Sequence, residues 1–409
     1  MELEARADLS GATDIVDRAD RIASVRRTLR QTSRRSQADV LRALRSASAP
    51  FQTFWLRNEI IFDGDQALVD QLRAIPGVAV VRPERVYPLV QPVERTTAIA
   101  AATGDPEWGV EKIGADEAWA QGVTGGGIVV ANIDTGVEFT HPALVAQYRG
   151  NNGDGSFTHE YNWWDPTGEC GDEPCDNVGH GTHTMGTMVG GDGAGPFAPD
   201  IGVAPGARWI AAKGCEDFSC SESALLSSGE FMVAPTDLGG LNPDPSRAPH
   251  IINNSWSGGP GDTFYQDIVD AWRASGIIPV FSSGNPGPDC GAGGSPGDYN
   301  NSFSVGATDI DDQIADFSGR GPSVFGKINP DVSAPGVDVV SAVPGGGYEA
   351  FSGTSMAAPH TAGTIALVLS ADPGLIGEID PTLSIVRTTA MDIVDLSCGG
   401  DGDGDPNNV

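Results

Sequence analysis

Four polar residues stand where predicted strands end or predicted helices begin, and their types suit nucleophilic catalysis. Asp134 follows the apolar run "VVANI", His180 opens the helix-like stretch "HGTHTMGTMVGG", and Ser355 lies in "FSGTSMAAPH". A serine hydroxyl becomes a good nucleophile when a histidine accepts its proton and a carboxylate fixes the tautomer of that histidine. Asn285, in "SSGN", adds a side-chain amide that can bind the oxyanion of a tetrahedral intermediate. Together the four residues predict acyl-transfer chemistry.

Each of these residues also has an ordinary structural interpretation when it is taken alone. Asp134 could cap the turn that follows it, and Ser355 could be the N-cap of an alanine-rich helix. His180 and His183 have a spacing that can bind a metal on one helix face, but the glutamate of the zinc-protease motif is missing. The combination in the order Asp, His, Asn, Ser favours catalysis, and a helix N-terminus at Ser355 would itself favour a nearby oxyanion.

The elements that position these residues are predicted by a second pattern, which begins at about residue 107. Apolar runs that each end in Gly, Asn or Asp alternate with helix-like stretches, which predicts an α/β fold with a mostly parallel sheet and helices on both faces. Functional sites in such sheets form at the carboxyl ends of the strands. The predicted strands lie in 127–136, 207–214, 250–259, 276–285 and 302–309, and the helix-like stretches in 223–235 and 263–275.

Residues 1–90 predict a separate, small α+β domain. An Arg-rich helical pattern is followed by an apolar run, a second helix that Pro76 and Gly77 end, and a strand; these stretches are 14–47, 51–64, 65–75 and 78–90. Residues 91–106 contain small residues with little pattern, which is typical of a flexible, exposed linker. We therefore expect a 1–90 domain, a 91–106 linker and a 107–409 domain.

The charge of the chain is unevenly distributed. The net charge is −31 at pH 7, yet residues 1–95 hold 15 Lys and Arg against 13 Asp and Glu, whereas residues 96–409 hold 9 against 42. This acidic excess argues against nucleic acid as a partner and favours solubility, cation binding or a salty medium; a solvated acidic surface is the simplest interpretation. No run of 18 apolar residues occurs, which argues against a membrane span, and the first residues lack the pattern of a signal peptide.

The six cysteines predict disulfides in an oxidising compartment. Cys170 and Cys175, and likewise Cys215 and Cys220, lie in polar loops without the two-residue spacing typical of zinc sites. We expect a local disulfide in each pair, which leaves Cys290 and Cys398 as a long-range pair. Reduced thiols in a cytosolic protein are the alternative.

The whole set of motifs resembles the subtilisin-like serine proteases (subtilases), and most of all the bacillopeptidase F type. The matching stretches are "IDTGV", "HGTHTMGT", "SSGN" and "GTSMAAPH", supported by "GVAPGA", "INNSW", "FSGRGP" and "PDVSAPG". The resemblance covers about residues 107–390. Residues 1–90 resemble the propeptide of this family, which assists folding and inhibits the site until it is cut off, so we expect self-processing near residues 88–106.

The resemblance implies a role for each site residue. Ser355 would attack the scissile carbonyl, His180 would move the proton, Asp134 would support the imidazolium, and Asn285 with the Ser355 N–H would bind the oxyanion. The substrate would lie as an extended strand, with the residue before the cut in a pocket formed by Ser255, Trp256, Ser257, Gly258, Ser282, Ser283, Gly284 and Gly294. None of these is charged, so we expect an apolar or aromatic residue before the cut.

Some positions depart from the family pattern. Ser257 stands where family members often have glycine, which could narrow the pocket mouth or add a hydrogen bond to substrate. The usual ligands of the strong calcium site are not apparent, since Ala143 stands nine positions after Asp134, and we transfer no calcium ligands. The tail "CGGDGDGDPNNV" has the alternating Asp and Gly of a calcium loop, or is a disordered acidic end. The family usually continues beyond this point, so we expect the chain to be incomplete at its C-terminus.

Taken together, these features predict a secreted, extracellular, monomeric serine endopeptidase acting on proteins or peptides, made as a zymogen and needing no cofactor for catalysis. A rival from another class is an acidic binding scaffold that has lost catalysis, but such a protein would lack at least one of the four site residues. A lipase-type hydrolase would need Gly-x-Ser-x-Gly and the order Ser, Asp, His; "GTSMA" lacks the second glycine.

Overall fold

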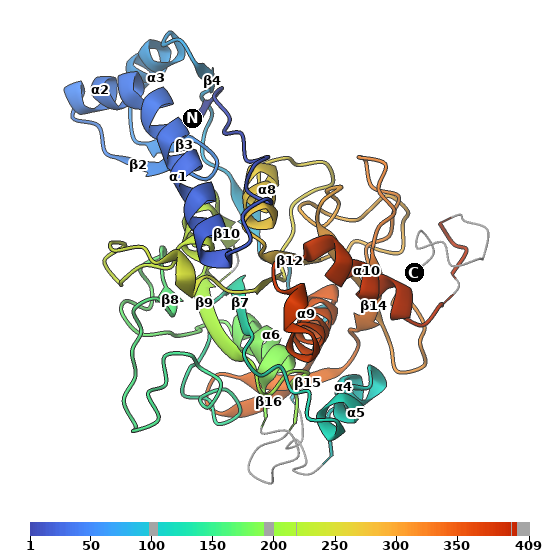
Figure 1. The fold of residues 1–409 in the computed structure, drawn as a ribbon. Coiled ribbons are helices and arrows are strands. Elements are labelled where there is room, and N and C mark those ends of the chain that lie inside the picture. Colours follow the sequence, from blue (N-terminus) through green and yellow to red (C-terminus); the bar gives the residue numbers. More distant parts are fainter. Residues whose placement is uncertain (98–104, 192–199, 218, 394, 399–409) are drawn as a thin grey trace.

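A computed structural model describes residues 1–97, 105–191, 200–217, 219–393 and 395–398 (Figure 1). We call residues 1–90 the N-terminal unit and residues 107–409 the C-terminal unit. A small α+β region with an antiparallel sheet precedes a parallel sheet packed with helices, which confirms the predicted fold class.

The N-terminal unit is a four-stranded antiparallel sheet with helices packed on it. The helical pattern over 14–47 forms two helices that meet at Gln37, and Asp17 caps the first by accepting a hydrogen bond from the Asp20 N–H. The apolar run over 51–64 forms a hairpin. The strand order is β2-β3-β1-β4. The elements are β1 (Glu2–Leu3), α1 (Arg18–Ser36), α2 (Ala38–Ser46), β2 (Phe51–Phe54), β3 (Glu59–Phe62), α3 (Gln66–Arg73) and β4 (Val78–Val80).

The C-terminal unit is built on a seven-stranded sheet in which every neighbouring pair is parallel. All five apolar runs that predicted strands are strands of this sheet, and the strand order is β14-β13-β12-β11-β7-β9-β8. The strands are β7 (Val129–Asp134), β8 (Trp163–Trp164), β9 (Arg208–Lys213), β11 (Ile251–Asn254), β12 (Ile278–Ser282), β13 (Phe303–Thr308) and β14 (Val332–Pro335).

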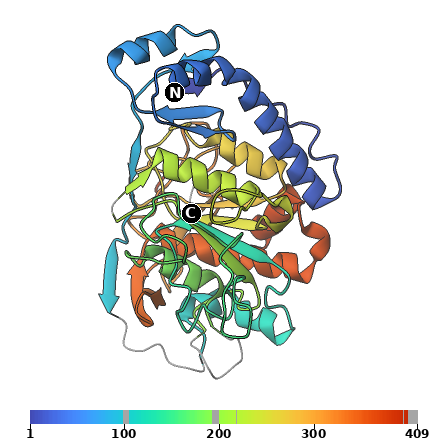
Figure 2. The ribbon, with the colours of Figure 1, turned by 90° about the vertical axis from the view of Figure 1, so that its left-hand side faces the viewer.

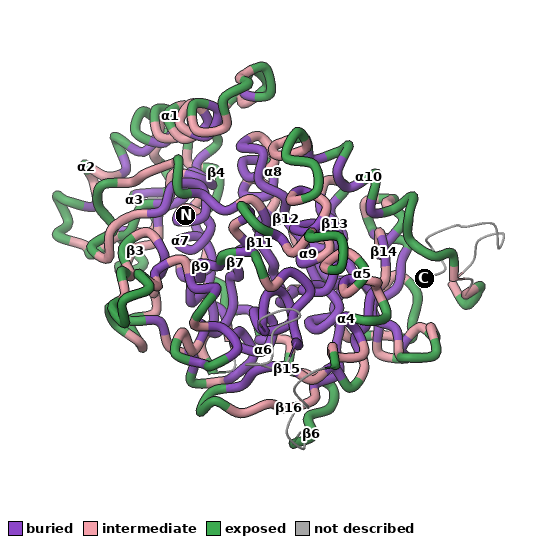
Figure 3. Tube along the Cα trace, turned by 60° about the horizontal axis from the view of Figure 1, so that its bottom comes forward, coloured by how far each residue is buried: buried purple, intermediate pink, exposed green. Residues whose placement is uncertain are grey.

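Successive residues of these strands enter two different cores, as the alternation of side chains along a strand requires. Val130 packs in the core with α6 (His180–Val189) and α9 (Thr354–Ala371), and its neighbour Ala131 packs in the core with α7 (Glu222–Val233) and α8 (Gln266–Ala274). The sheet is thus covered on both faces, which explains why its strands read as continuous apolar runs. Figure 3 shows the burial of its central strands and of α6 and α9.

The remaining elements lie around this sheet. Two short strands, β15 (Val339–Val343) and β16 (Gly347–Ser352), form a hairpin beside α6. Another short strand, β10 (Ser219–Ser221), precedes α7. The other helices are α4 (Trp108–Lys112), α5 (Ala115–Ala120), α10 (Ile379–Thr389) and two 3-10 turns, η1 (Pro245–Arg247) and η2 (Pro373–Leu375).

One sequence expectation about residues 78–106 was wrong in detail. The predicted single strand over 78–90 is two strands in different sheets: β4 stays in the N-terminal unit, and β5 (Val86–Pro88) pairs with β10. The chain leaves the first sheet at Pro83, whose ring cannot donate a ladder hydrogen bond. The predicted linker contains a strand, β6 (Glu94–Thr97), which pairs with β16; residues 98–104 of the linker lie outside the described residues.

The N-terminal unit packs on α7 and α8 of the C-terminal unit (Figure 2). Ile22, Val25 and Leu29 of α1 belong to the same buried cluster as α7 and α8. Beside this apolar contact, Glu222 of α7 is fully buried and accepts hydrogen bonds from Arg57 at 3.3 Å and from Arg82 at 2.5 and 2.7 Å. Charge pairing thus accompanies apolar burial where the two units meet.

The six cysteines form the three predicted disulfides, Cys170–Cys175, Cys215–Cys220 and Cys290–Cys398. The first two lie beside the end of β7: the Cys215 N–H donates to the Asp134 carbonyl at 3.1 Å, and the Cys175 carbonyl lies where a side chain at Gly136 would begin. Among the described helices, none has the length and apolar character needed to cross a bilayer.

Candidate active site

Asp134 and His180 are joined by a buried hydrogen bond at the carboxyl end of β7. His180 is the first residue of α6, and its Nδ1 lies 2.7 Å from Asp134 Oδ1; the two side chains are 2% and 1% exposed. Burial works to lower the pKa of His180, but the charge and hydrogen bond of Asp134 outweigh it, so the pKa lies above the ordinary value. The pair has the arrangement of a general base held by a carboxylate.

The start of α6 is fixed by a second carboxylate, Asp176, which the sequence analysis did not single out. Asp176 accepts hydrogen bonds from the Thr135 hydroxyl at 2.9 Å, from the Gly179 N–H at 2.8 Å, and from both the N–H and the hydroxyl of Thr182 at 2.8 and 2.7 Å. It thereby ties the end of β7 to the helix that carries His180, and its negative charge also raises the pKa of His180.

Small residues allow α6 to approach β7 closely. A side chain at Gly181 would begin 2.1 Å from the Gly136 carbonyl oxygen, which no Cβ can tolerate. Gly179, which precedes the helix, has a φ of +94°, a conformation that favours glycine. The backbone therefore requires glycine at both positions next to His180 in "NVGHGTH".

Ser355 lies in the first turn of α9 and is fully buried. Its Oγ donates to the Ser255 carbonyl at 3.2 Å, and the Ser255 hydroxyl donates to the Ser355 carbonyl at 3.0 Å. His180 Nε2 is buried and makes no hydrogen bond within the described residues, so it is available to accept a proton. The interpretation of Ser355 as the N-cap of this helix was wrong, because α9 begins at Thr354 and its N-cap is Gly353.

Asn285 lies just beyond the end of β12 and is oriented by Thr354. Its Oδ1 accepts hydrogen bonds from the Thr354 N–H at 2.9 Å and from the Thr354 hydroxyl at 2.8 Å. With its oxygen held in this way, the amide group of Asn285 donates to the carbonyl oxygen of Gln91 at 3.4 Å. The Gln91 carbonyl therefore contacts the Asn285 amide, which the sequence predicts to be the hydrogen-bond donor to the oxyanion.

The residues around Gln91 cross the site as an extended strand, and we call residues 86–97 the crossing segment. On one side of Gln91, β5 pairs antiparallel with β10; on the other side, the Val93 N–H donates to the Ser352 carbonyl at 2.7 Å and β6 pairs antiparallel with β16. The segment thus adds strands to two edges of the C-terminal unit, which is a common way for proteins to hold peptides.

The predicted pocket residues are brought together beside Asn285. A Cβ at Gly284 would lie 3.1 Å from Ser257 Oγ, and one at Gly294 would lie 2.6 Å from the Gly258 carbonyl oxygen. The pocket walls are therefore close: Gly294 has no room for a side chain, and Gly284 has a φ of +88°, a conformation that favours glycine. Seven of the eight predicted residues are buried and Gly258 is half-buried, whereas the side chain of Gln91 is exposed and does not fill the pocket.

His183, the other histidine of the motif, has a structural position. Its Nε2 lies 3.1 Å from the carbonyl oxygens of Val339 and Glu349, and its ring stacks on Phe351 at 4.1 Å. Burial lowers its pKa to about 3, so it stays neutral. In the described part of the chain no group of three His, Cys, Asp or Glu could hold a metal ion, and the acidic tail over 399–409 lies outside that part.

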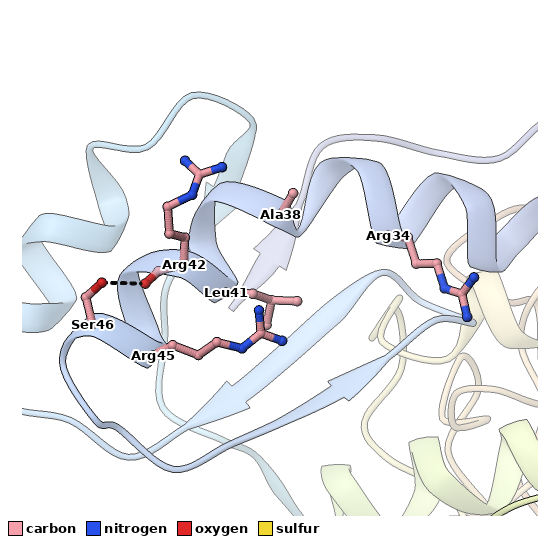
Figure 4. Close-up of a pocket in the computed structure, with 6 residues that line it drawn as sticks. All are labelled: Arg34, Ala38, Leu41, Arg42, Arg45 and Ser46. Carbon is pink, nitrogen blue, oxygen red and sulfur yellow. Dashed lines mark hydrogen bonds between the residues drawn. The ribbon is translucent and has the colours of Figure 1, made fainter.

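A separate pocket on the N-terminal unit is basic and contributes no residue to this site. It lies along α1 and α2 (Figure 4), and three of its six lining residues are arginines; the residues are Arg34, Ala38, Leu41, Arg42, Arg45 and Ser46.

Three contributors to this geometry were not predicted from the sequence, namely Asp176, Thr354 and the crossing segment. Asp176 had a usable signal, because it is a carboxylate four residues before His180 at a predicted helix start. Thr354 is the neighbour of Ser355, but its bond to Asn285 joins residues 69 apart. The crossing segment has a composition typical of a linker, and its pairing with β10 and β16 depends entirely on the fold.

Comparison with known proteins agrees with this fold. A model of the Subtilase family matches residues 125–400, and the chain belongs to that family, the subtilisin-like serine proteases. It is 40% identical over 388 residues to bacillopeptidase F of Bacillus subtilis (strain 168), covering 90% of this chain and 26% of that protein. It is 32% identical over 315 residues to subtilisin E of the same organism, and the match covers 76% of this chain and 70% of that protein. It is 31% identical over 312 residues to an alkaline protease of Shouchella clausii, and that match covers 75% of this chain and 72% of that protein. The chain thus spans about a quarter of the length of bacillopeptidase F.

Proposed function

We propose that this chain is a serine endopeptidase, made as a self-processing zymogen, in which Asp134, His180 and Ser355 form the catalytic triad. One observation carries the proposal: α6, which begins with the buried Asp134–His180 pair, packs on α9, whose first turn holds Ser355 and the Thr354 that binds Asn285. Membership of the subtilase family supports the same reaction.

The reaction follows from the groups present. Ser355 Oγ exchanges its bond to Ser255 for one to His180 Nε2 and attacks the scissile carbonyl carbon as His180 takes the proton. Asn285 and the Ser355 N–H bind the oxyanion, while Asp134 stabilises the imidazolium. His180 gives the proton to the leaving amine, and water then attacks the acyl-enzyme by the same route in reverse.

The zymogen part of the proposal rests on the crossing segment. Residues 1–90 act as the propeptide domain, residues 91–106 as the linker that is cut, and residues 107–409 as the catalytic domain. While the segment adds strands to β10 and β16, no other peptide can occupy those edges. The bond that follows the Gln91 carbonyl is the one presented to Ser355, because this carbonyl faces Asn285.

The remaining properties are proposed on chemical grounds. The uncharged pocket favours an apolar or aromatic residue before the cut, in protein or peptide substrates. Three disulfides suit an extracellular location. We propose a monomer that needs no cofactor for catalysis, with the acidic tail as a structural calcium site.

The test compares the full chain with its Ser355→Ala variant. The wild-type chain should lose about 10 of its 42.3 kDa on incubation and should react with a serine-directed fluorophosphonate, whereas Ser355→Ala should do neither. If the wild-type chain also stays whole and unlabelled, the proposed peptidase function is wrong. That result is the one expected of the rival, a binding scaffold without activity.

A further inference from the structure

The upstream half of the crossing segment indicates which residues of the C-terminal unit a bound substrate would contact. Cys220 is paired with Tyr87 in the antiparallel ladder of β5 and β10, and four residues beyond Tyr87 the chain reaches the Asn285 amide. A substrate that presents its carbonyl to Asn285 and adds a strand to β10 must follow the same path. The contacts of residues 85–89 are therefore contacts that a substrate can make.

Tyr87 occupies a slot that suits a flat ring. Its side chain is 7% exposed, and its ring stacks on Phe264 with centroids 4.7 Å apart and planes 20° apart. A Cβ at Gly258 would lie 3.2 Å from two ring carbons of Tyr87, so the absence of a side chain there makes room for the ring. Stacked rings and a tight glycine wall favour an aromatic residue over an aliphatic one of similar size.

Asp262 adds two charge-assisted contacts at the same place. Its Oδ2 accepts a hydrogen bond from the Tyr87 hydroxyl at 3.2 Å, and both of its oxygens accept from Arg85 Nη1 at 2.8 Å. The Phe264 N–H donates to Asp262 Oδ1 at 3.0 Å, which fixes the carboxylate beside the slot. Arg85 is the single ion-pair partner of Asp262 among the described residues, and it lies in the N-terminal unit.

When the N-terminal unit leaves, Asp262 loses this partner and Phe264 loses the ring above it. Arg57, whose guanidinium lies 5.4 Å from the centre of the Phe264 ring, leaves with the same unit. A carboxylate and an aromatic wall then remain, side by side, along the edge that receives substrate. They are complementary to a cation and an aromatic ring two residues apart on one strand, since such residues point to the same face.

We propose that Asp262 and Phe264 form a specificity site that selects substrates with arginine or lysine two residues before an aromatic residue, upstream of the cut. The inference rests on the proposed peptidase function and adds a substrate class to it. The ion pair lies partly in water, with Arg85 44% and Asp262 23% exposed, so its effect on kcat/KM should be modest, about two- to fivefold. The buried ring should have a larger effect, about tenfold.

The experiment uses the full chain after self-processing and four quenched-fluorescence peptides. All share the backbone Arg-Val-Tyr-Pro-Leu-Val-Gln-Ala-Val-Glu, and alanine replaces the arginine, the tyrosine, both or neither. The variants are Asp262→Asn, Phe264→Ala and, as a matched control for the lost charge, Asp311→Asn, an exposed carboxylate beyond β13. Fluorophosphonate labelling counts the active sites in each preparation.

The proposal expects wild type and Asp311→Asn to prefer arginine over alanine by about two- to fivefold, and Asp262→Asn to lose that preference while still preferring tyrosine. Phe264→Ala should lose most of the preference for tyrosine. If Asp262→Asn labels normally but still prefers arginine as wild type does, the inference is wrong and the peptidase function stands. The same conclusion follows if Asp262→Asn changes only the release of the N-terminal unit. A wild-type chain that neither labels nor cleaves any peptide overturns both.

Discussion

Thr354 holds the side-chain oxygen of Asn285 with two hydrogen bonds, from its N–H at 2.9 Å and from its hydroxyl at 2.8 Å. Because that oxygen is held, the amide of Asn285 faces the crossing segment. Thr354 is therefore a positioning residue for the proposed oxyanion site, and it is adjacent in sequence to the proposed nucleophile.

Replacing Thr354 by valine should lower kcat by about three- to tenfold with little change in KM, because one of the two bonds to Asn285 is lost and the side-chain volume is kept. Thr354→Ser retains the hydroxyl and should retain most of the activity. Asn285→Ala removes the donor itself and should cost about 10²–10³ in kcat. Steady-state kinetics on a peptide substrate measures all three; a rise in KM without loss of kcat in Thr354→Val would argue against a positioning role.

The acid limb of the pH–activity profile should lie above the ordinary imidazole pKa of about 6.5. The pKa of His180 is raised because the charge of Asp134 outweighs the effect of burial, and a base must be deprotonated to accept the Ser355 proton. Activity should therefore rise with pH through the raised pKa. Asp134→Asn should move this limb to lower pH and reduce kcat by about 10⁴. A limb at the same pH in both proteins would show that Asp134 does not tune His180.

Pro92 should slow self-processing. The carbonyl at Asn285 belongs to Gln91, so the proposed scissile bond is Gln91–Pro92, whose nitrogen carries a ring in place of a hydrogen. Pro92→Ala should speed the cut by about tenfold, and intact mass should place it after Gln91 in both proteins. Val93→Ala is the control for a change of size next to the bond. A cut elsewhere in the linker would contradict the register of the crossing segment.

The N-terminal unit should be released more readily as the pH rises. Glu230 of α7 accepts hydrogen bonds from the Trp55 and Leu56 N–H groups, and burial raises its pKa to about 8. An exposed glutamate has a pKa of about 4.3. Between about pH 4.3 and pH 8, Glu230 is therefore protonated when the N-terminal unit is bound and ionised when that unit has left. Binding is then tightest below about pH 4 and weakens by at most about tenfold per pH unit up to pH 8.

The appearance of peptidase activity after processing, followed from pH 5 to 8, measures this release. Glu230→Gln keeps a side-chain oxygen that can accept both bonds but cannot titrate, so its release should depend less on pH; Asp311→Asn should behave as wild type. Some dependence should remain, because burial also raises the pKa of Glu59 at the same contact to about 7. An equally steep profile in Glu230→Gln would exclude Glu230 as the source.

The central strands of the C-terminal unit could be predicted because they are buried on both faces of the sheet. Continuous apolar runs ending at Asp134 and Ser282 locate the carboxyl ends of β7 and β12, and the topology of a parallel sheet brings those ends together. The position of Asn285 near Ser355 follows from that rule. The roles of individual residues needed the family resemblance in addition.

The path of residues 78–97 could not be predicted, because its strands have no apolar alternation of their own. All four residues of β6 are exposed, and β6 exists because β16 offers a free edge. The same holds for Glu222 and Glu230, which are the two charged residues of α7. Among the described residues, the hydrogen-bond partners of their carboxylates all belong to the docked N-terminal unit, and a single sequence does not show which surfaces will meet.

Every residue of α6 and 14 of the 18 residues of α9 are buried, so His180 and Ser355 are carried by helices with little exposed surface. Segments of this kind open only when the whole domain unfolds. Heat should therefore leave each molecule either fully active or inactive, with no partly damaged catalyst in between. The half-life of activity at a given temperature would then report the rate constant of global unfolding, so that a simple peptide assay could measure kinetic stability.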